Sequence, residues 1–179
     1  MPIDPIERAM LRERAVDRWR NSKALRREAG FLAGGGSVNT TTLEHLADRA
    51  IREWRSPHRD LRRLDGGTAL VASANMGELI RFKELVATSV PYVLGASDAG
   101  TALGLAIVTQ PDLAIVDNRL ELASGIDLAL NLPFYAPRTR ALVLTDDPER
   151  AHDVLVVGFE TARRHANDSM VLDWIERTF

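Results

Sequence analysis

The spacing of apolar and polar residues changes near residue 66, and the change divides the chain into two parts. Before it, apolar residues recur at helical spacing. From Thr68 onward, short apolar runs alternate with helical segments, which is typical of a parallel sheet covered by helices on both faces. We therefore expect a helical extension over residues 1–66, followed by an α/β domain over residues 67–179.

The first helix is expected over residues 4–29. Asp4 can cap it, Pro5 suits its first turn, and Gly30 is expected to end it. Its apolar stripe is loose and the arginines lie largely off it. The stripe consists of Ile6, Ala9, Met10, Val16 and Trp19.

A second helix is marked by Thr41 and Glu44, which have the spacing of a capping box, and by Ser56-Pro57, which should stop it. The glycine-rich segment 33–37 is expected to be a flexible connector. The narrow apolar face of this helix must be covered by the first helix, by the α/β domain or by another copy of the chain. The face consists of Leu43, Leu46, Ala47, Ala50, Ile51 and Trp54.

Four strands of the α/β domain follow from short apolar runs bounded by turn residues. Pro133 and Pro137 are expected to bracket a loop before the fourth strand. The helices between strands are expected around Leu79–Val86, at Ala99–Thr109 and from Gly125 to Leu132, and a last helix carries Met170, Leu172, Trp174 and Ile175. The strands are expected at Thr68–Ser73, Tyr92–Ala96, Leu113–Asp117 and Ala141–Thr145.

The position of the fifth strand is open. If Val154–Val157 ends a fourth helix, the strand is the polar segment Thr161–Arg164. If instead the strand is Asp153–Phe159, only a degenerate helix around Pro148–Ala151 precedes it. Spacing favours the first arrangement, whereas enrichment in β-branched residues favours the second.

Composition adds little beyond exclusions. The 179 residues are 45% hydrophobic and 27% charged, as in soluble globular proteins. No apolar run approaches the ~20 residues of a membrane span, and the N-terminus lacks the apolar core of a signal peptide. The absence of cysteine excludes disulfides and thiolate zinc sites. We expect a cytoplasmic protein with no membrane association.

The net charge of −2 conceals an asymmetry, because residues 1–66 carry +4 and the remainder −6. A basic front could bind nucleic acid. However, the connector is too long and glycine-rich for the short turn of a helix-turn-helix motif. Dimerisation or packing onto the α/β domain is therefore favoured over DNA binding, which stays open.

Several residues in the second part of the chain stand at the spacing of a known family. Asp117 ends the third strand, at the edge where open α/β sheets place their chemistry. The segment from Thr68 to Phe179 resembles the receiver domain of two-component response regulators. The residues that carry the resemblance are Ala96, Gly100, Ala102, Leu103, Pro111, Asp112, Leu113, Asp117, Arg119, Leu120, Gly125, Thr145 and Gly158.

The resemblance implies a five-stranded parallel doubly wound sheet and a phosphoaspartate at Asp117. In that family a Mg²⁺ held by acids after the first strand offsets charge, and a lysine after the fifth strand grips the phosphoryl group. Thr145 matches the switch hydroxyl that follows the fourth strand. The phosphoryl oxygens draw this hydroxyl inward and thereby move the fourth helix and fifth strand.

The chain departs from this pattern at the positions that bind the cation. The acidic pair should fall within residues 72–75, where Ala74 and Asn75 are the degenerate positions. Neutral oxygens bind hard cations weakly, so no metal or cofactor is expected. The lysine position falls on His165 or Arg164. Asp117 is thus either an unorthodox phosphoacceptor or a structural aspartate that caps the next turn or pairs with Arg119.

These observations predict a pseudo-receiver that signals through a protein partner, is not an enzyme, and does not use conventional Mg²⁺-dependent phosphorylation. A homodimer is compatible with this reading. Two alternatives are kept. One is a transcription regulator with a DNA-binding front, and the other is a small-molecule sensor that uses the crevice beside Asp117.

Overall fold

The computed structural model describes residues 1–33, 38–54 and 66–179. A five-stranded, all-parallel sheet of order β2-β1-β3-β4-β5 forms its centre, as predicted. The strands are β1 Thr68–Ala72, β2 Tyr92–Ala96, β3 Leu113–Asp117, β4 Arg140–Leu144 and β5 Glu160–Ala162. The helices in the described part are α1 Pro5–Ala33, α2 Val38–Trp54, α3 Met76–Ala87, α4 Ala99–Thr109, α5 Gly125–Tyr135, α6 Pro148–Val156 and α7 Asp168–Thr178.

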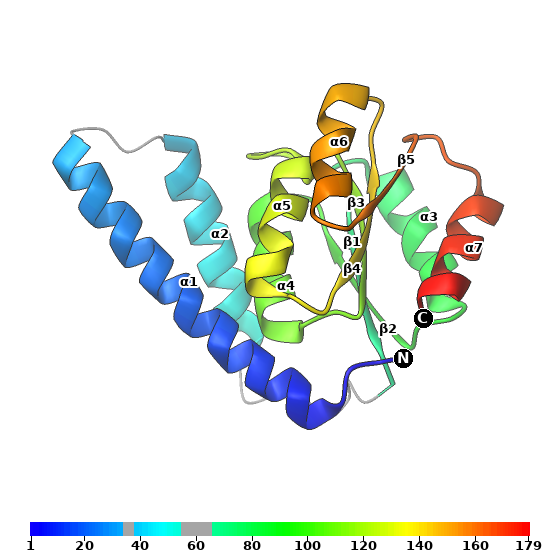
Figure 1. Cartoon of the computed structure of the whole chain (residues 1–179), viewed down its shortest axis with the longest axis horizontal. Coiled ribbons are helices and arrows are strands. Elements are labelled where there is room, and N and C mark those ends of the chain that lie inside the picture. The colour runs from blue at the N-terminus through cyan, green and yellow to red at the C-terminus, as the bar shows by residue number, and fades with distance from the viewer. Residues whose placement is uncertain (34–37, 55–65) are drawn as a thin grey trace.

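Helices cover both faces of the sheet, and the N-terminal pair adds a further layer on one side (Figure 1). Because side chains alternate along a strand, each strand contributes to two cores. Ala114 and Val116 of β3 pack on the α4–α5 side, and Leu113 and Ile115 pack on the α3–α7 side. The two apolar faces explain why β1, β3 and β4 are nearly continuous runs of buried residues.

The helices α1 and α2 form a hairpin that lies against α4 and α5 (Figure 1). The helix α4 is therefore enclosed between the hairpin and the sheet, and ten of its residues are buried. Gly100 and Gly104 face α2 so closely that a Cβ at Gly104 would lie 2.5 Å from the Ala47 carbonyl oxygen. The apolar face predicted for α2 is confirmed, and it contributes Ala47, Ala50 and Ile51 to the core on this side of the sheet.

The apolar stripe predicted for α1 is correct only in its second half. Val16 and Trp19 are buried, but Ile6 and Met10 are 72% and 51% exposed. The buried residue of the first turns is Arg8, which forms an ion pair with Asp112. The side of the first turns that faces the α/β domain is thus set by the ion pair of Arg8 with Asp112, and Ile6 is left facing solvent.

Two predicted helix boundaries are wrong. The helix α1 continues past Gly30 to Ala33, since a single glycine within a helix costs only about 1 kcal/mol. The helix α2 begins at Val38, so Thr41 lies inside it and does not cap it. The connector 33–37 and the stop at Ser56-Pro57 lie largely or wholly outside the described residues.

Pro133 lies within α5, where a loop was predicted. Tertiary contacts hold the last turn of this helix although proline removes one backbone donor. The Tyr135 ring packs edge-on against Trp19 with 5.8 Å between the ring centroids. The Tyr135 carbonyl also accepts a hydrogen bond of 2.8 Å from Gln110 Nε2.

The first of the two arrangements for the fifth strand is the one that forms. The helix α6 extends to Val156, and the strand follows at Glu160–Ala162. The alternative strand Asp153–Phe159 is therefore wrong. Its β-branched residues are instead accommodated in a helix that begins at Pro148 with Asp147 as its cap. The β4 strand lies one residue earlier than predicted, so Thr145 follows it directly.

Candidate functional site

The candidate site lies at the carboxyl edge of the sheet, where β1 and β3 lie next to each other and their connecting helices leave on opposite sides. Asp117, the last residue of β3, is 3% exposed. Ser73 follows β1 and Thr145 follows β4, so parallel pairing brings both to the same edge as Asp117.

Three groups donate four hydrogen bonds to the Asp117 carboxylate. The Arg164 guanidinium donates through Nε to Oδ1 at 2.9 Å and through Nη2 to Oδ2 at 3.3 Å. The Ser73 hydroxyl donates to Oδ2 at 3.1 Å, and the Arg119 backbone N–H donates to Oδ1 at 3.0 Å. Thus Asp117 caps the next turn through the Arg119 amide, but its ion-pair partner is Arg164.

The Arg164–Asp117 pair is largely shielded from water, because the two side chains are only 14% and 5% exposed. The hydrogen bond to Asp117 raises the pKa of Arg164 above its ordinary value, which outweighs the opposite effect of burial. Arg164 therefore supplies a permanent positive charge beside Asp117.

The positions where the receiver resemblance implies acids carry none. Ala74 is exposed and has no side-chain donor or acceptor. Asn75 caps the N-terminus of α3, and its Oδ1 accepts a hydrogen bond of 3.2 Å from the Glu78 amide. The Ser73 hydroxyl accepts from the Asn75 amide at 3.2 Å while it donates to Asp117. The polar groups of this loop are thus engaged in hydrogen bonds within the loop and its helix cap and to Asp117.

Thr145 is 6% exposed and lies on the other side of the same edge. Its hydroxyl accepts hydrogen bonds from Asn118 Nδ2 at 3.3 Å and from the Asp147 amide at 3.0 Å. Asn118 follows Asp117 directly, so Thr145 is linked to β3 through a neighbour of Asp117.

The structure separates the two residues that could occupy the lysine position. Arg164 lies in the turn after β5 and points to Asp117, and its backbone N–H donates to Asp146 Oδ1 at 3.3 Å. His165 is exposed. Of the predicted site residues, the structure brings together Asp117 and Arg164, with Thr145 one residue away through Asn118.

One contact near the site had no signal in the sequence. Arg150 of α6 donates to Asp127 Oδ1 at 2.6 Å and to the Ser124 hydroxyl at 3.1 Å. Ser124 and Asp127 form the capping box of α5. This contact fastens α6 to the start of α5, and its residues are 23 to 26 positions apart, which is too far for a local pattern to reveal.

Across residues 1–33, 38–54 and 66–179, no three His, Asp or Glu side chains gather as a metal site would need. No helix in the described part of the chain is both long enough and apolar enough to cross a bilayer.

Comparison with known proteins gives structural neighbours only, since no family model and no curated protein match the chain. A CheY-like response regulator receiver domain protein from Methanospirillum hungatei aligns with a TM-score of 0.58 at 18% identity, covering 62% of this chain and 91% of the other. The chemotaxis response regulator CheY4 of Vibrio cholerae gives 0.56 at 18%, covering 63% and 98%. A LuxR-family two-component response regulator from Aurantimonas gives 0.55 at 19%, covering 62% and 83%.

The fold is therefore that of response regulator receiver domains, as the sequence predicted. The matches cover most of each neighbour but less than two thirds of this chain. The covered share is close to the share that residues 67–179 represent. At these identities the likeness concerns the fold, and the chemistry depends on the residues around Asp117.

Proposed function

We propose that this chain is a pseudo-receiver, a signalling module that acts through protein contacts and does not use conventional Mg²⁺-dependent phosphorylation. Residues 67–179 form the receiver-like part, and residues 1–66 form its helical extension. The observation that carries the proposal is the contact of the Arg164 guanidinium with both carboxylate oxygens of Asp117. It lies in a site where the loop after β1, residues 73–75, has no acidic residue.

The donor set around Asp117 does not fit Mg²⁺. This ion needs near-ideal octahedral coordination by oxygen and usually binds through one or two carboxylates. Ala74 offers no oxygen from its side chain, and Asn75 Oδ1 is engaged in capping α3. Only Asp117 could contribute a charge, and its carboxylate faces a guanidinium that would repel a dication.

Arg164 also opposes nucleophilic attack by Asp117. A carboxylate oxygen must approach phosphorus with a free lone pair, whereas Oδ1 and Oδ2 each accept two hydrogen bonds here. An arginine cannot release its proton near neutral pH, so the ion pair persists. The geometry supports a site that is neutralised without phosphate.

The proposed working surface consists of α6, β5 and α7. Leu155 and Val156 at the end of α6 are 53% and 71% exposed, an unusual placement for two adjacent apolar side chains. A pocket of about 500 Å³ lies between the start of α6 and β5, and Thr145 lines it. A protein partner, or a second copy of the chain, that binds here would contact the elements next to Thr145.

A role in DNA binding has less support because several N-terminal arginines are engaged within the chain. Arg8 pairs with Asp112, Arg26 with Glu44 and Arg49 with Glu53. The sensor alternative has less support because the Arg164 side chain occupies the crevice beside Asp117.

The decisive experiment incubates the protein with acetyl phosphate and MgCl₂ and measures the intact mass. We expect no phosphoryl adduct in the wild type. Mg²⁺-dependent modification that disappears in Asp117→Asn would contradict the proposal.

The absence of an adduct in the wild type is informative only if a variant of the same protein can be phosphorylated in the same assay. Ala74→Asp, Asn75→Asp and Arg164→Lys together restore the acids and the lysine that the family pattern requires. Aspartate is also a good helix cap, so Asn75→Asp should preserve the start of α3. We expect this variant to become labelled under the conditions in which the wild type is inert.

Self-association through the proposed surface is tested by light scattering after size exclusion with Val156→Glu. If the wild type is a dimer, the buried charge should shift the variant to monomer. Ile80→Glu, on an exposed position of α3, is the matched control. A monomeric wild type at high concentration would exclude the homodimer and leave a different protein as the partner.

A further inference from the structure

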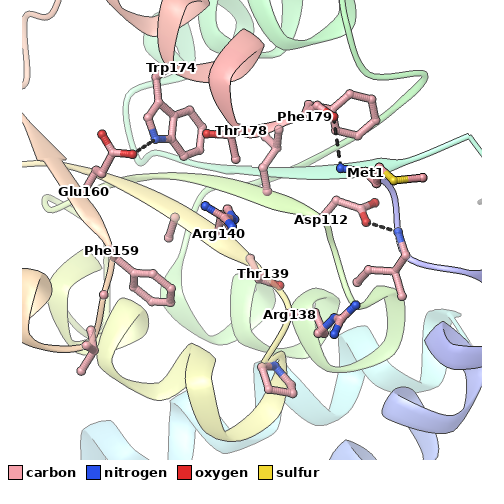
Figure 2. A pocket seen from close by; sticks show the side chains of 16 residues that line it. Met1, Asp112, Arg138, Thr139, Arg140, Phe159, Glu160, Trp174, Thr178 and Phe179 are labelled. Atoms are coloured by element: carbon pink, nitrogen blue, oxygen red, sulfur yellow. Dashed lines mark hydrogen bonds between the residues drawn. The ribbon is translucent and has the colours of Figure 1, made fainter.

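A cavity of about 670 Å³ lies at the amino edge of the sheet, opposite the edge that carries Asp117. It extends between the first residues of β4 and β5 and the C-terminal end of α7 (Figure 2). This volume is within the range of pockets that bind small organic molecules. The site around Asp117 uses neither this edge nor these residues.

Arg140 lies in the middle of the residues that line this cavity (Figure 2). It is the first residue of β4 and belongs to the face of the sheet that packs on α7, because it is in step with Leu142 and Leu144. The residue is exposed, so its guanidinium reaches the solvent-filled part of the cavity.

The charges around the cavity leave Arg140 without a carboxylate partner. Arg138 pairs with Glu7 at 3.5 Å, Arg177 with Glu160 at 3.5 Å, and Arg8 with Asp112 at 2.7 Å. In residues 1–33, 38–54 and 66–179, no hydrogen bond or ion pair engages the Arg140 side chain. One guanidinium with five donors therefore faces the cavity unpaired.

Two mostly buried aromatic side chains are among the residues that line the cavity. Trp174 and Phe159 are 3% and 9% exposed and are held in place, the former by a 3.1 Å hydrogen bond from Nε1 to Glu160 Oε1. Gly158, at φ +85°, brings backbone without a side chain to the same wall, where an added Cβ would meet open space.

We infer that this cavity binds a small organic molecule that carries one anionic group, a phosphate or a carboxylate. The Arg140 guanidinium binds the anion by donating two parallel N–H hydrogen bonds to its oxygens. The inference is independent of the function proposed for Asp117, because it uses a different edge of the sheet and different residues.

The test is an amide-resolved NMR titration of the full chain with phenyl phosphate, benzoate and phenol in 150 mM NaCl, where weak surface attraction is screened. Fragments of this size bind with dissociation constants of about 1 mM, so the titration must reach tens of millimolar. We expect saturable shifts at Arg140, Gly158 and Phe159 with at least one anion, and none there with phenol. The anion that binds identifies the acidic group.

Two variants assign the charge. Arg140→Gln should weaken binding at least tenfold, whereas Arg27→Gln, the same change on an exposed part of α1, should leave it unchanged. Equal binding by phenol, equal binding by Arg140→Gln, or no saturable shift with either anion would overturn the inference. Because the phenol comparison uses the wild type, it decides the question even if Arg140→Gln is poorly folded.

Discussion

The Arg164 guanidinium contacts both carboxylate oxygens of Asp117 across the carboxyl edge of the sheet, Nε to Oδ1 at 2.9 Å and Nη2 to Oδ2 at 3.3 Å. The two residues are 47 positions apart in the chain. Their contact joins the end of β3 to the turn after β5, which are separated in the sheet by β4. The pair therefore fastens the turn after β5 to the centre of the sheet.

Replacing Arg164 with glutamine should show how much this ion pair contributes to the free energy of unfolding. Asp117 would keep the Ser73 and Arg119 donors but lose its counter-charge in a shielded position. We expect the free energy of unfolding at pH 7 to fall by about 2–3 kcal/mol. Urea denaturation measures this, and Arg163→Gln, at the exposed neighbouring position, should change stability by less than about 0.5 kcal/mol. Equal effects of the two variants would show that the pair adds nothing.

The lowered pKa of Asp127 predicts how the free energy of unfolding changes with pH in the acidic range. Burial raises the pKa of Asp127, but hydrogen bonds from Ser124 and Arg150 outweigh it and hold the pKa below the ordinary value of 3.8. A lowered folded-state pKa stabilises the fold above pH 3.8, and this contribution is lost as the pH falls through the folded-state value. Asp127→Asn should therefore flatten the fall in stability below pH 4.

Urea denaturation between pH 3 and 6 measures that slope. Asp173→Asn, on an exposed position of α7, is the control and should keep the wild-type slope. An unchanged slope in Asp127→Asn would show that the Arg150 contact does not persist in solution.

The fold could be predicted from the sequence because its strands are short apolar runs with turn residues at both ends. Leu113–Asp117 and Tyr92–Ala96 coincide with the strands of the structure. The fifth strand was ambiguous because Glu160–Ala162 is only three residues long and none is fully buried, so it has no hydrophobic pattern. Its position follows from pairing with β4, which is a non-local contact.

The site residues that end a strand or directly follow one could be predicted from the sequence. Asp117 and Thr145 are found by position, and Arg164 by its distance from Gly158. The ion pairs Arg8–Asp112 and Arg150–Asp127 could not be predicted, since each joins residues from separate helices or loops. The wholly apolar character of α4 does carry a signal, because a helix without a polar face must be covered on all sides.

Gly104 tests whether the helical hairpin is an integral part of the fold. A Cβ at this position would lie 2.5 Å from the Ala47 carbonyl oxygen and 2.7 Å from Ala50 Cβ, so α2 would have to move away from α4. We expect Gly104→Ala to lower the free energy of unfolding by about 2–3 kcal/mol, although alanine favours helix. Faster amide hydrogen exchange throughout α2 should accompany this loss.

The matched control is Gly77→Ala in the first turn of α3. Its nearest neighbour is the Asn75 side chain at 3.2 Å, which can shift slightly. We expect this variant to be neutral or slightly stabilising. If both variants behave alike, close packing between α2 and α4 is not what requires glycine at position 104.

Loss of Arg8 from the first turns of α1 should be costly. Its guanidinium pairs with Asp112 at 2.7 Å and donates to the carbonyls of Thr109 and Gln110, with both charged side chains only 6% exposed. Arg8→Met keeps the apolar stem but leaves Asp112 with only the Ile3 and Thr68 amides as donors. We expect a loss of about 2–4 kcal/mol, measured by urea denaturation.

Arg12→Met is the control, because its partner Glu13 is 57% exposed and the pair should contribute less than about 1 kcal/mol. Combining Arg8→Met with Asp112→Asn removes the orphaned charge, while the asparagine oxygen still accepts from one of the two amides. The double variant should therefore be less destabilised than the sum of its parts, since the two residues interact directly. Strict additivity would mean that the Arg8 charge acts on the fold independently of Asp112.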